Sequence, residues 1–148
     1  MNTPRIRPLA LCIFHHQGKI LVHQFHDPVA GRTIFRPVGG GIEFGETSHE
    51  AIVREIREEL DAAVTDLRLI GTLENIFVWQ GVPGHEIVRV FDGRFEDSRL
   101  YERDYLDGCE DDGAAFTVRW LGRESFTGDV VLAPDGLGEL LEGMGLLR

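Results

Sequence analysis

The chain is most constrained by residues 39–62, where three consecutive glycines lead into a strongly charged, amphipathic stretch. Thr47 and Glu50 within this stretch have the spacing of a capping box, in which each side chain accepts a hydrogen bond from the other residue's backbone N–H. A capping box marks the first turn of a helix, and the apolar residues that follow recur at helical spacing. The sequence therefore predicts a helix over 48–60 that begins directly after a glycine-rich loop.

At about 100° per residue, the predicted helix has two neighbouring faces of different character. Three carboxylates, those of Glu55, Glu58 and Glu59, share one face. Like charges at this spacing destabilise a helix by roughly a few tenths of a kcal/mol per pair. The adjacent face is apolar and is expected to pack on the core, with Ile52, Val53, Ile56 and Leu60. The acidic face beside it is therefore expected at the edge of the core, where a cleft can form.

Two interpretations of the acidic face are open, a solvated surface and a cation site. The preceding glycines favour the cation site, because they let the backbone approach a ligand closely and aim its amides and carbonyls at that ligand. Carboxylate oxygens are suitable ligands for Mg²⁺ or Mn²⁺. Such a cation neutralises a diphosphate and lowers the pKa of a bound water. The stretch therefore indicates metal-assisted hydrolysis of a phosphoanhydride, which needs no nucleophilic Ser or Cys.

The net charge of −10 over 148 residues limits the partners of the chain. An acidic surface repels duplex nucleic acid and anionic membranes, so neither is expected to bind. A nucleotide is compatible with this charge, because divalent cations can lie between carboxylates and phosphates. The length suits one domain over 1–148. No apolar run has the length of a signal segment or a membrane span, so we expect a cytoplasmic protein.

The cysteines and histidines do not indicate a second reactive site. Cys12 lies in an apolar run and is expected in the core, whereas Cys109 lies among acidic residues that disfavour a thiolate. Two cysteines without a pairing pattern fit a reducing compartment. Four histidines lie within 15–26, but their spacing matches no zinc pattern.

Apolar and alternating runs predict strands over 6–14, 19–24, 34–38, 64–70, 73–79, 86–95 and 116–121. A loop is predicted over 26–33, a long polar loop or a loop with a helical turn over 96–113, and a second, weaker helix over 136–144. Strands before, between and after two helices are typical of an α+β domain, here an α/β/α sandwich with a mixed β-sheet.

The substrate pocket must include residues outside the helix. Arg36, just before the glycines, suits either a phosphate ligand or a surface charge. Phe77 and Trp79 lie on a strand where an aromatic ring can stack on a base, although core packing is favoured for them. Further candidates are polar residues on facing strands of one hairpin, some of which face the cleft and others the surface: Glu74, Asn75, His85 and Glu86.

Residues 40–62 resemble the Nudix box, whose family pattern is G-x5-E-x7-R-E-U-x-E-E-x-G-U, where U is a bulky apolar residue. Two positions depart from the pattern. Asp61 replaces the final glycine, at a helix end where Asp also tolerates a left-handed conformation, and Ala62 is small at the last apolar position. The predicted order of strands and helices also fits the Nudix α/β/α sandwich. The matching residues are Gly40, Glu46, Arg54, Glu55, Ile56, Glu58 and Glu59.

The resemblance implies a role for each matching polar residue. Glu55, Glu58 and Glu59 are expected to bind divalent cations, and Glu55 or Glu58 is expected to act catalytically on the attacking water. Glu46 and Arg54, with Gly40, are expected to brace the loop against the helix.

Two further metal ligands are implied by the same resemblance. One is the carbonyl of Gly39, directly before the box. The other is a carboxylate from a later loop, for which we select Glu110 from four alternatives: Glu102, Glu110, Asp111 and Asp112.

Three functions remain open at this point. The first is a Mg²⁺-dependent hydrolase of a nucleoside diphosphate linked to a moiety X, such as a nucleoside triphosphate, ADP-ribose or a sugar nucleotide. The second is a non-catalytic nucleotide-binding module, which has little use for three intact carboxylates. The third is a prenyl diphosphate isomerase, which requires a proton donor such as Cys facing the substrate. A homodimer is compatible with each of them.

Overall fold

The computed structural model describes residues 3–148. Its first half contains β1 (Arg7–Ile13), β2 (His15–His16), β3 (Lys19–Asp27), β4 (Arg32–Gly41) and α1 (Ser48–Leu60). Its second half contains β5 (Val64–Trp79), β6 (Val82–Phe95), the 3₁₀ helix η1 (Ser98–Glu102), β7 (Tyr105–Cys109), β8 (Ala115–Leu121), the 3₁₀ helix η2 (Arg123–Ser125), β9 (Val130–Leu132) and α2 (Leu137–Gly143). No helix in residues 3–148 is long and apolar enough to cross a membrane.

Strand β4 connects the two halves of the sheet. Its residues 38–41 pair with β1, and its residues 32–37 pair with β3. The strand order is β5-β6-β1-β4-β3-β8-β7, with β2 added to β3 and β9 added to β4. The pairs β1–β6 and β4–β9 are parallel and the other pairs antiparallel. The mixed sheet predicted from the sequence is therefore confirmed.

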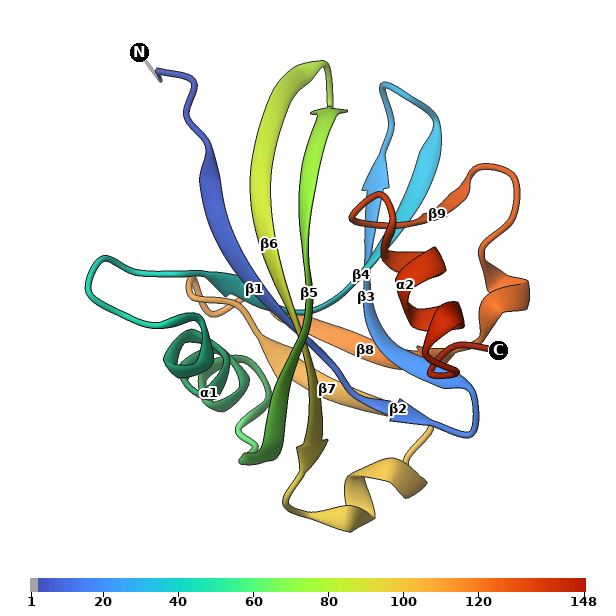
Figure 1. The fold of residues 1–148 in the computed structure, drawn as a ribbon. Coiled ribbons are helices and arrows are strands. Elements are labelled where there is room, and N and C mark those ends of the chain that lie inside the picture. Colours follow the sequence, from blue (N-terminus) through green and yellow to red (C-terminus); the bar gives the residue numbers. More distant parts are fainter. Residues whose placement is uncertain (1–2) are drawn as a thin grey trace.

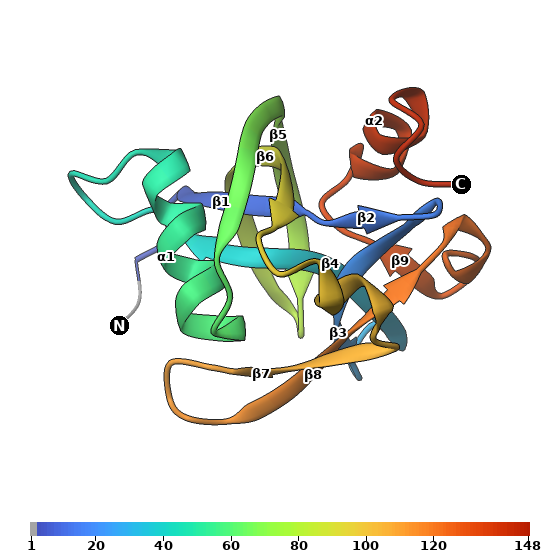
Figure 2. The same cartoon turned by 90° about the horizontal axis from the view of Figure 1, so that it is seen from below.

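Alternating side chains of β1 separate the core into two layers. Ala10 and Cys12 belong to a buried cluster on the side of α1, as the sequence predicts for Cys12. Leu9 and Leu11 belong to a second cluster, to which α2 contributes Leu137 and Leu141. Figures 1 and 2 show α1 and α2 on opposite sides of the strands. This arrangement confirms the predicted α/β/α sandwich.

The apolar face predicted for α1 is partly wrong. Val53 is 44% exposed, whereas Ala51 is buried with Ile52 and Ile56. Compared with the prediction, the buried face of the helix is rotated about the helix axis so that it includes Glu55, which is only 8% exposed. This rotation brings a carboxylate of the acidic face against the sheet.

Three predicted loop or strand boundaries are also wrong. The segment 96–113 contains the helical turn η1, which agrees with the second predicted form, but it also contains a strand, because β7 pairs along β8 from Tyr105 to Cys109. The strands predicted over 64–70 and 73–79 form one strand, β5, whose register shifts between Leu69 and Gly71. The loop predicted over 26–33 is shorter, because β3 and β4 remain paired as far as Asp27 and Arg32.

Candidate active site

The glycines before α1 permit close contacts between the helix, β4 and β1. A Cβ atom added at Gly40 would lie 2.5–2.7 Å from the carboxyl atoms of Glu55. A Cβ atom at Gly39, whose φ is +146°, would collide with the backbone of Ala10. Only glycine therefore lets Glu55 rest on β4 while β4 pairs with β1.

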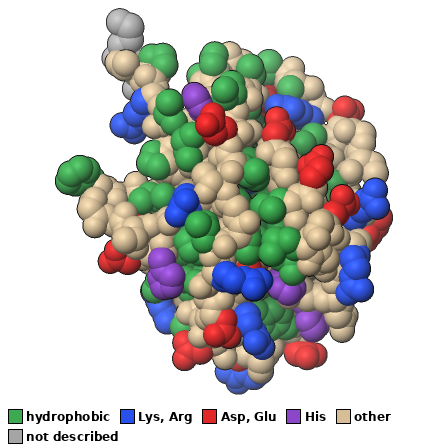
Figure 3. Space-filling model, in the orientation of Figure 1, with side chains coloured by type: hydrophobic (Ala, Val, Ile, Leu, Met, Phe, Trp, Pro, Cys, Tyr) green, Lys and Arg blue, Asp and Glu red, His purple; other side chains and the backbone are tan. Residues whose placement is uncertain are grey.

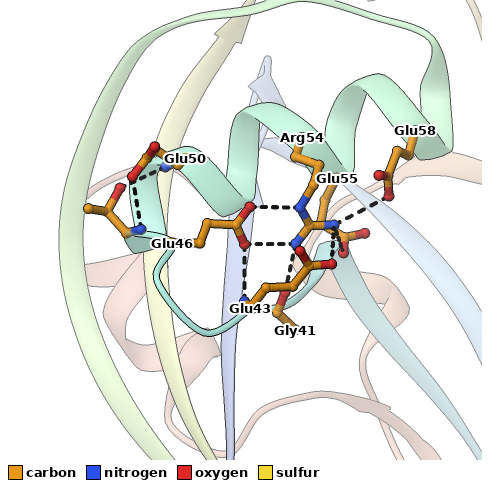
Figure 4. A network of polar contacts seen from close by, with 8 residues as sticks. Gly41, Glu43, Glu46, Glu50, Arg54, Glu55 and Glu58 are labelled. Carbon is orange, nitrogen blue, oxygen red and sulfur yellow. Dashed lines mark hydrogen bonds and ion pairs between the residues drawn. The ribbon is translucent and has the colours of Figure 1, made fainter.

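Arg54 joins the glycine loop to the acidic face, as Figure 4 shows. Its Nε and Nη2 donate to the two carboxylate oxygens of Glu46 at 2.7 and 2.9 Å. Nη2 also donates to the Gly41 carbonyl at 2.9 Å. Nη1 donates to Glu55 Oε1 at 2.8 Å and to Glu58 Oε2 at 3.3 Å. One guanidinium thus orients both the loop and two of the three helix carboxylates.

The ion pair with Arg54 changes the acidity of both partners. Hydrogen bonds from Arg54, and then from the backbone N–H of Glu43, lower the pKa of Glu46 to about 2. The same contact with Glu46 raises the pKa of Arg54 above its usual range. Both groups are therefore charged at neutral pH, and the ion pair between Glu46 and Arg54 is intact there.

The charge of Glu55 affects the pKa of both Glu59 and Glu110. Burial raises the pKa of Glu59 well above its ordinary value, and the neighbouring Glu55 and Glu110 carboxylates raise it further. The pKa of Glu110 is also raised, first by burial and then by charges that include Asp112, Asp111 and Glu55. Glu110, selected from the sequence, thus lies within the electrostatic influence of Glu55 and Glu59.

Carboxylate oxygens are the ligands that a hard divalent cation prefers, and its positive charge would favour the ionised forms of Glu59 and Glu110, whose pKa values are raised. Across residues 3–148, no three His, Cys, Asp or Glu side chains are arranged closely enough to hold a metal ion. Arg54 holds oxygens of both Glu55 and Glu58 in this arrangement. The Glu58 side chain is 46% exposed and therefore has room to turn toward a cation.

Two of the three other loop candidates line different hollows, and Asp112 lines neither of these. Asp111 lines a groove of about 650 Å³ together with Glu55 and Glu58. Glu102 lines a different hollow beside His15 and is not brought to the acidic face.

A cavity of about 250 Å³ lies between the β3–β4 and β5–β6 hairpins. Both hairpin tips point to the same end of the molecule in Figure 1. The cavity contains five of the sequence candidates: Arg36, Asn75, Phe77, Trp79 and Glu86. Its other lining residues are Arg7, Phe25, Arg32, Ile34, Val131, Ala133 and Asp135.

The aromatic residues of the cavity do not belong to the core. Phe77 is half-buried, lines the cavity and packs on Gly84, where a Cβ would collide with its ring. Phe25 and Trp79 meet edge to face, with ring centroids 6.3 Å apart. The core packing favoured for Phe77 and Trp79 is therefore wrong, because the β5–β6 hairpin extends beyond the helices that cover the sheet.

Glu86 and Arg36 are held together inside the cavity. Glu86 is 4% exposed, and its Oε2 lies 3.9 Å from Arg36 Nη1. Arg36 also lies over the Phe25 ring, 5.3 Å from its centroid. Burial lowers the pKa of Arg36, and the charge of Glu86 opposes that shift. Of the two roles open for Arg36, the surface charge is therefore the poorer description.

Glu74 and His85 do not join the cavity. His85 Nε2 lies 3.8 Å from Glu74 Oε2 across the β5–β6 hairpin, and Glu74 is exposed. His85 lines a separate, open hollow with Phe77 and Trp79.

Sequence reasoning missed Arg7, Phe25 and Arg32. Arg7 reaches the cavity because it is the register partner of Glu86 in the parallel pair β1–β6. No local sequence pattern predicts a pairing between strands so far apart in the chain. For Phe25 and Arg32, the sequence offered one signal: an aromatic residue and an arginine lie beside the apolar residues of β3 and β4.

The chain resembles known proteins over most of its length. The model of the NUDIX domain family matches residues 4–135. The chain is 34% identical over 71 residues to the NAD-capped RNA hydrolase NudC of Mycobacterium bovis (strain BCG / Pasteur 1173P2), covering 47% of this chain and 22% of NudC. The same figures hold for NudC of Mycobacterium tuberculosis (strain ATCC 25177 / H37Ra). The chain thus spans about a fifth of the length of these curated relatives.

Solved structures share the fold. A MutT NUDIX hydrolase from Burkholderia pseudomallei aligns with a TM-score of 0.65 at 21% identity, over 93% of this chain and 97% of the other. A NUDIX hydrolase from Nitrosomonas europaea aligns with a TM-score of 0.58 at 14% identity, over 99% and 93%. At these identities the likeness concerns the arrangement of the elements.

Proposed function

Because the chain belongs to the NUDIX domain family, we propose that it is a divalent-cation-dependent hydrolase of a nucleoside diphosphate linked to a further group. The family predicted from residues 40–62 is confirmed, and the comparisons support the enzyme class, a pyrophosphohydrolase. The observation that carries the finer proposal is the Glu55 carboxyl placed against Gly40, with Arg54 joining it to Glu58. The charges of the two carboxylates make a site for a cation and, through it, for a phosphate.

Mg²⁺, or Mn²⁺ in its place, would be held by Glu55, Glu58, Glu59 and Glu110 with the carbonyl of Gly39. The bound cation supplies charge neutralisation of the phosphates and a more acidic water. Arg54 keeps Glu55 and Glu58 on one side of the helix and leaves Glu58 Oε1 for other partners. We assign the proton of the attacking water to a carboxylate oxygen of Glu58, with Glu55 as the alternative.

The nucleoside half of the substrate is proposed to enter the cavity between the hairpins. Phe25, Phe77 and Trp79 offer ring surfaces on which a base can stack. The cavity, about 250 Å³, is smaller than the roughly 300–1,000 Å³ of sites for drug-sized ligands, so it suits one base rather than a dinucleotide. Arg36 and Glu86 line the cavity, and Glu74 and His85 are proposed to contact the substrate outside it.

The test is a panel of nucleoside triphosphates, ADP-ribose, sugar nucleotides, dinucleoside polyphosphates and NAD, each with Mg²⁺ or Mn²⁺, followed by phosphate or nucleotide release. NAD is included because the NudC relatives are named for NAD-capped RNA. Turnover that requires the cation and is lost in Glu58→Gln and Glu59→Gln is expected. The control is Glu139→Gln, an exposed carboxylate on α2.

Two results would overturn the proposal. If the protein binds a nucleotide but hydrolyses no member of the panel, the non-catalytic binding module is correct. If both Gln variants turn over substrate as fast as the unchanged protein, the acidic face is not the cation site. The isomerase alternative gains no support, because Cys12 is buried in the core and neither cysteine lines the cavity.

We propose a small-molecule nucleotide partner, a cytoplasmic location and the absence of a duplex nucleic acid or membrane partner. Cell fractionation tests the location. Sedimentation equilibrium tests whether the protein is a homodimer.

A further inference from the structure

Glu86 lies between two arginines rather than one. Its Oε2 is 3.7 Å from Arg7 Nη1 and 3.9 Å from Arg36 Nη1. The carboxylate is 4% exposed, whereas the side chains of Arg7 and Arg36 are 57% and 31% exposed. One buried anion thus orients two guanidinium groups that both reach solvent.

This arginine pair stands between the two parts of the proposed site. Both arginines line the cavity that contains Phe25, and Arg7 also lines the groove that contains Glu55. Arg36 lies within the electrostatic influence of Glu59. A substrate that joins the cavity to the acidic face must therefore pass the arginine pair.

The pair has positive charge and hydrogen-bond donors to spare. One carboxylate offsets only one of two guanidinium charges. The separations of 3.7 and 3.9 Å exceed the roughly 2.7–3.2 Å of a good N–H···O bond, so Glu86 does not saturate the N–H donors of either arginine. A phosphate group accepts paired N–H donors from guanidinium groups and carries the complementary charge.

We infer that Arg7 and Arg36 grip the phosphate next to the nucleoside and that Glu86 is a positioning residue that holds both in place. This inference rests on the proposed function and adds to it a substrate-binding residue, Arg7, and a phosphate site that needs no metal. The ligand class is a nucleoside 5′-phosphate with its base in the cavity. Phosphates farther from the nucleoside extend toward Glu55.

Binding without metal tests the phosphate grip separately from turnover. In the Trp120→Phe background, Trp79 of the cavity is the only tryptophan left of the two in the chain. Its fluorescence is titrated in EDTA with the four ribonucleoside 5′-monophosphates and with the matching nucleosides. At least one monophosphate is expected to bind about tenfold or more tightly than its nucleoside, as one charge-assisted contact contributes.

Arg7→Ala and Arg36→Ala are each expected to reduce the affinity for the monophosphate to near that of the nucleoside. Arg94→Ala, an exposed arginine at the other end of β6, is the control and leaves the affinity unchanged. Arg7→Lys keeps the charge but loses the planar donors, so it is expected to bind less tightly than the unchanged protein. Thermal melts of each variant show that it is folded.

Glu86→Gln separates positioning from simple charge. If Glu86 acted only as a negative charge near the phosphate, its removal would strengthen nucleotide binding. A positioning role predicts the opposite, because both arginines lose their common partner. The affinity for the monophosphate is then expected to fall, while the affinity for the nucleoside stays unchanged. An unchanged or stronger affinity for the monophosphate overturns the assignment of Glu86.

The outcomes for the two proposals are distinguishable. Nucleotide binding that depends on Arg7 in a protein that hydrolyses nothing supports the phosphate grip and contradicts the proposed hydrolase. Hydrolysis with a normal KM in Arg7→Ala and Arg36→Ala contradicts the grip and supports the hydrolase. Equal affinity for nucleosides and monophosphates also contradicts the grip.

Discussion

At the scale of single residues, the candidate site depends on contacts that only one type of residue permits. Gly40 is the clearest case, because it is the floor on which the Glu55 carboxylate rests. Gly41, the next residue, has no atom within 4 Å of the position that a Cβ would occupy. Two adjacent glycines of one strand therefore differ sharply in how much they tolerate a methyl group.

Gly40→Ala is expected to displace Glu55 and to lower kcat by about 100-fold, since a shift of roughly 1 Å can have that effect. Stability is expected to fall by about 1–3 kcal/mol, the usual range for overpacking. Steady-state kinetics and urea unfolding provide the two measurements. Gly41→Ala is the matched control, and a similar loss in both variants would contradict the contact argument.

His23 is a second residue whose environment has a measurable consequence. Its ring lies 4.2 Å from those of both Phe25 and Phe116. Burial, followed by the charge of Arg36, lowers its pKa from 6.5 to about 4. The unfolded chain therefore binds a proton at His23 more readily than the folded protein, and this residue destabilises the fold as the pH falls from 6.5 toward 4.

His23→Phe keeps an aromatic ring in this position and removes the titration. The decrease in Tm between about pH 7.5 and about pH 5 is expected to be smaller in the variant than in the unchanged protein. Differential scanning calorimetry at several pH values measures it. His26→Phe, an exposed position on the same strand, is the control. An unchanged pH dependence in His23→Phe would show that His23 is protonated as easily when folded as when unfolded.

At the scale of the element, α1 was the part of the fold that local signals determine best. Thr47 Oγ1 accepts from Glu50 N at 3.1 Å, and Glu50 Oε1 accepts from Thr47 N at 3.0 Å, which is the predicted capping box. The helix runs from Ser48 to Leu60 as predicted, and Asp61 follows in the left-handed conformation. The rotation of the helix was not predictable, because it depends on Gly40 and on the Arg54 contacts.

Thr47→Ala is expected to destabilise the protein by about 1 kcal/mol, the typical effect of losing an N-cap. For a protein of this size, that corresponds to a decrease in Tm of about 2–4 °C. Thr47→Ser keeps the hydroxyl and is expected to stay close to the unchanged protein. Chemical denaturation of the three proteins checks the order, and equal stability of all three would contradict the cap.

At the scale of the whole molecule, the pocket depended on pairings that no local pattern specifies. Phe77 and Trp79 alternate along β5 much as core residues do, and their place became clear only from the extension of β5–β6 beyond the helices. Arg7 meets Glu86 through β1–β6, a pairing between distant segments. The residues of the proposed cation site could be named from the sequence because most of them lie on one helix. The residues proposed to contact the rest of the substrate could be named only as polar or aromatic candidates.

The net charge is also a property of the whole molecule. Acidic and basic side chains are interspersed on the face drawn in Figure 3, so the excess of −10 is not confined to one patch of that face. This charge repels a nucleotide at long range, whereas Arg7 and Arg36 attract it only at short range. Between about 10 mM and 150 mM salt the Debye length falls from roughly 30 to 8 Å, so the long-range repulsion is screened more.

The association rate of a nucleoside triphosphate in the absence of metal is therefore expected to rise with salt over this range. Stopped-flow fluorescence of Trp79 measures the rate. The uncharged nucleoside serves as the control and is expected to show little change. A rate that falls steeply with salt would mean that local attraction controls the encounter.

Strand β4 supports the proposed cation site at one end and the nucleoside cavity at the other. Gly40 lies under Glu55, and Arg36 lies four residues earlier on the same strand. At about 3.3 Å per residue, the two positions are roughly 13 Å apart, and a paired strand does not stretch. In the proposed function, the strand would act as a molecular ruler that measures from the nucleoside end of the substrate. Lengthening the phosphate chain is therefore expected to change the size of the released fragment, while the nucleotide product keeps the same number of phosphates.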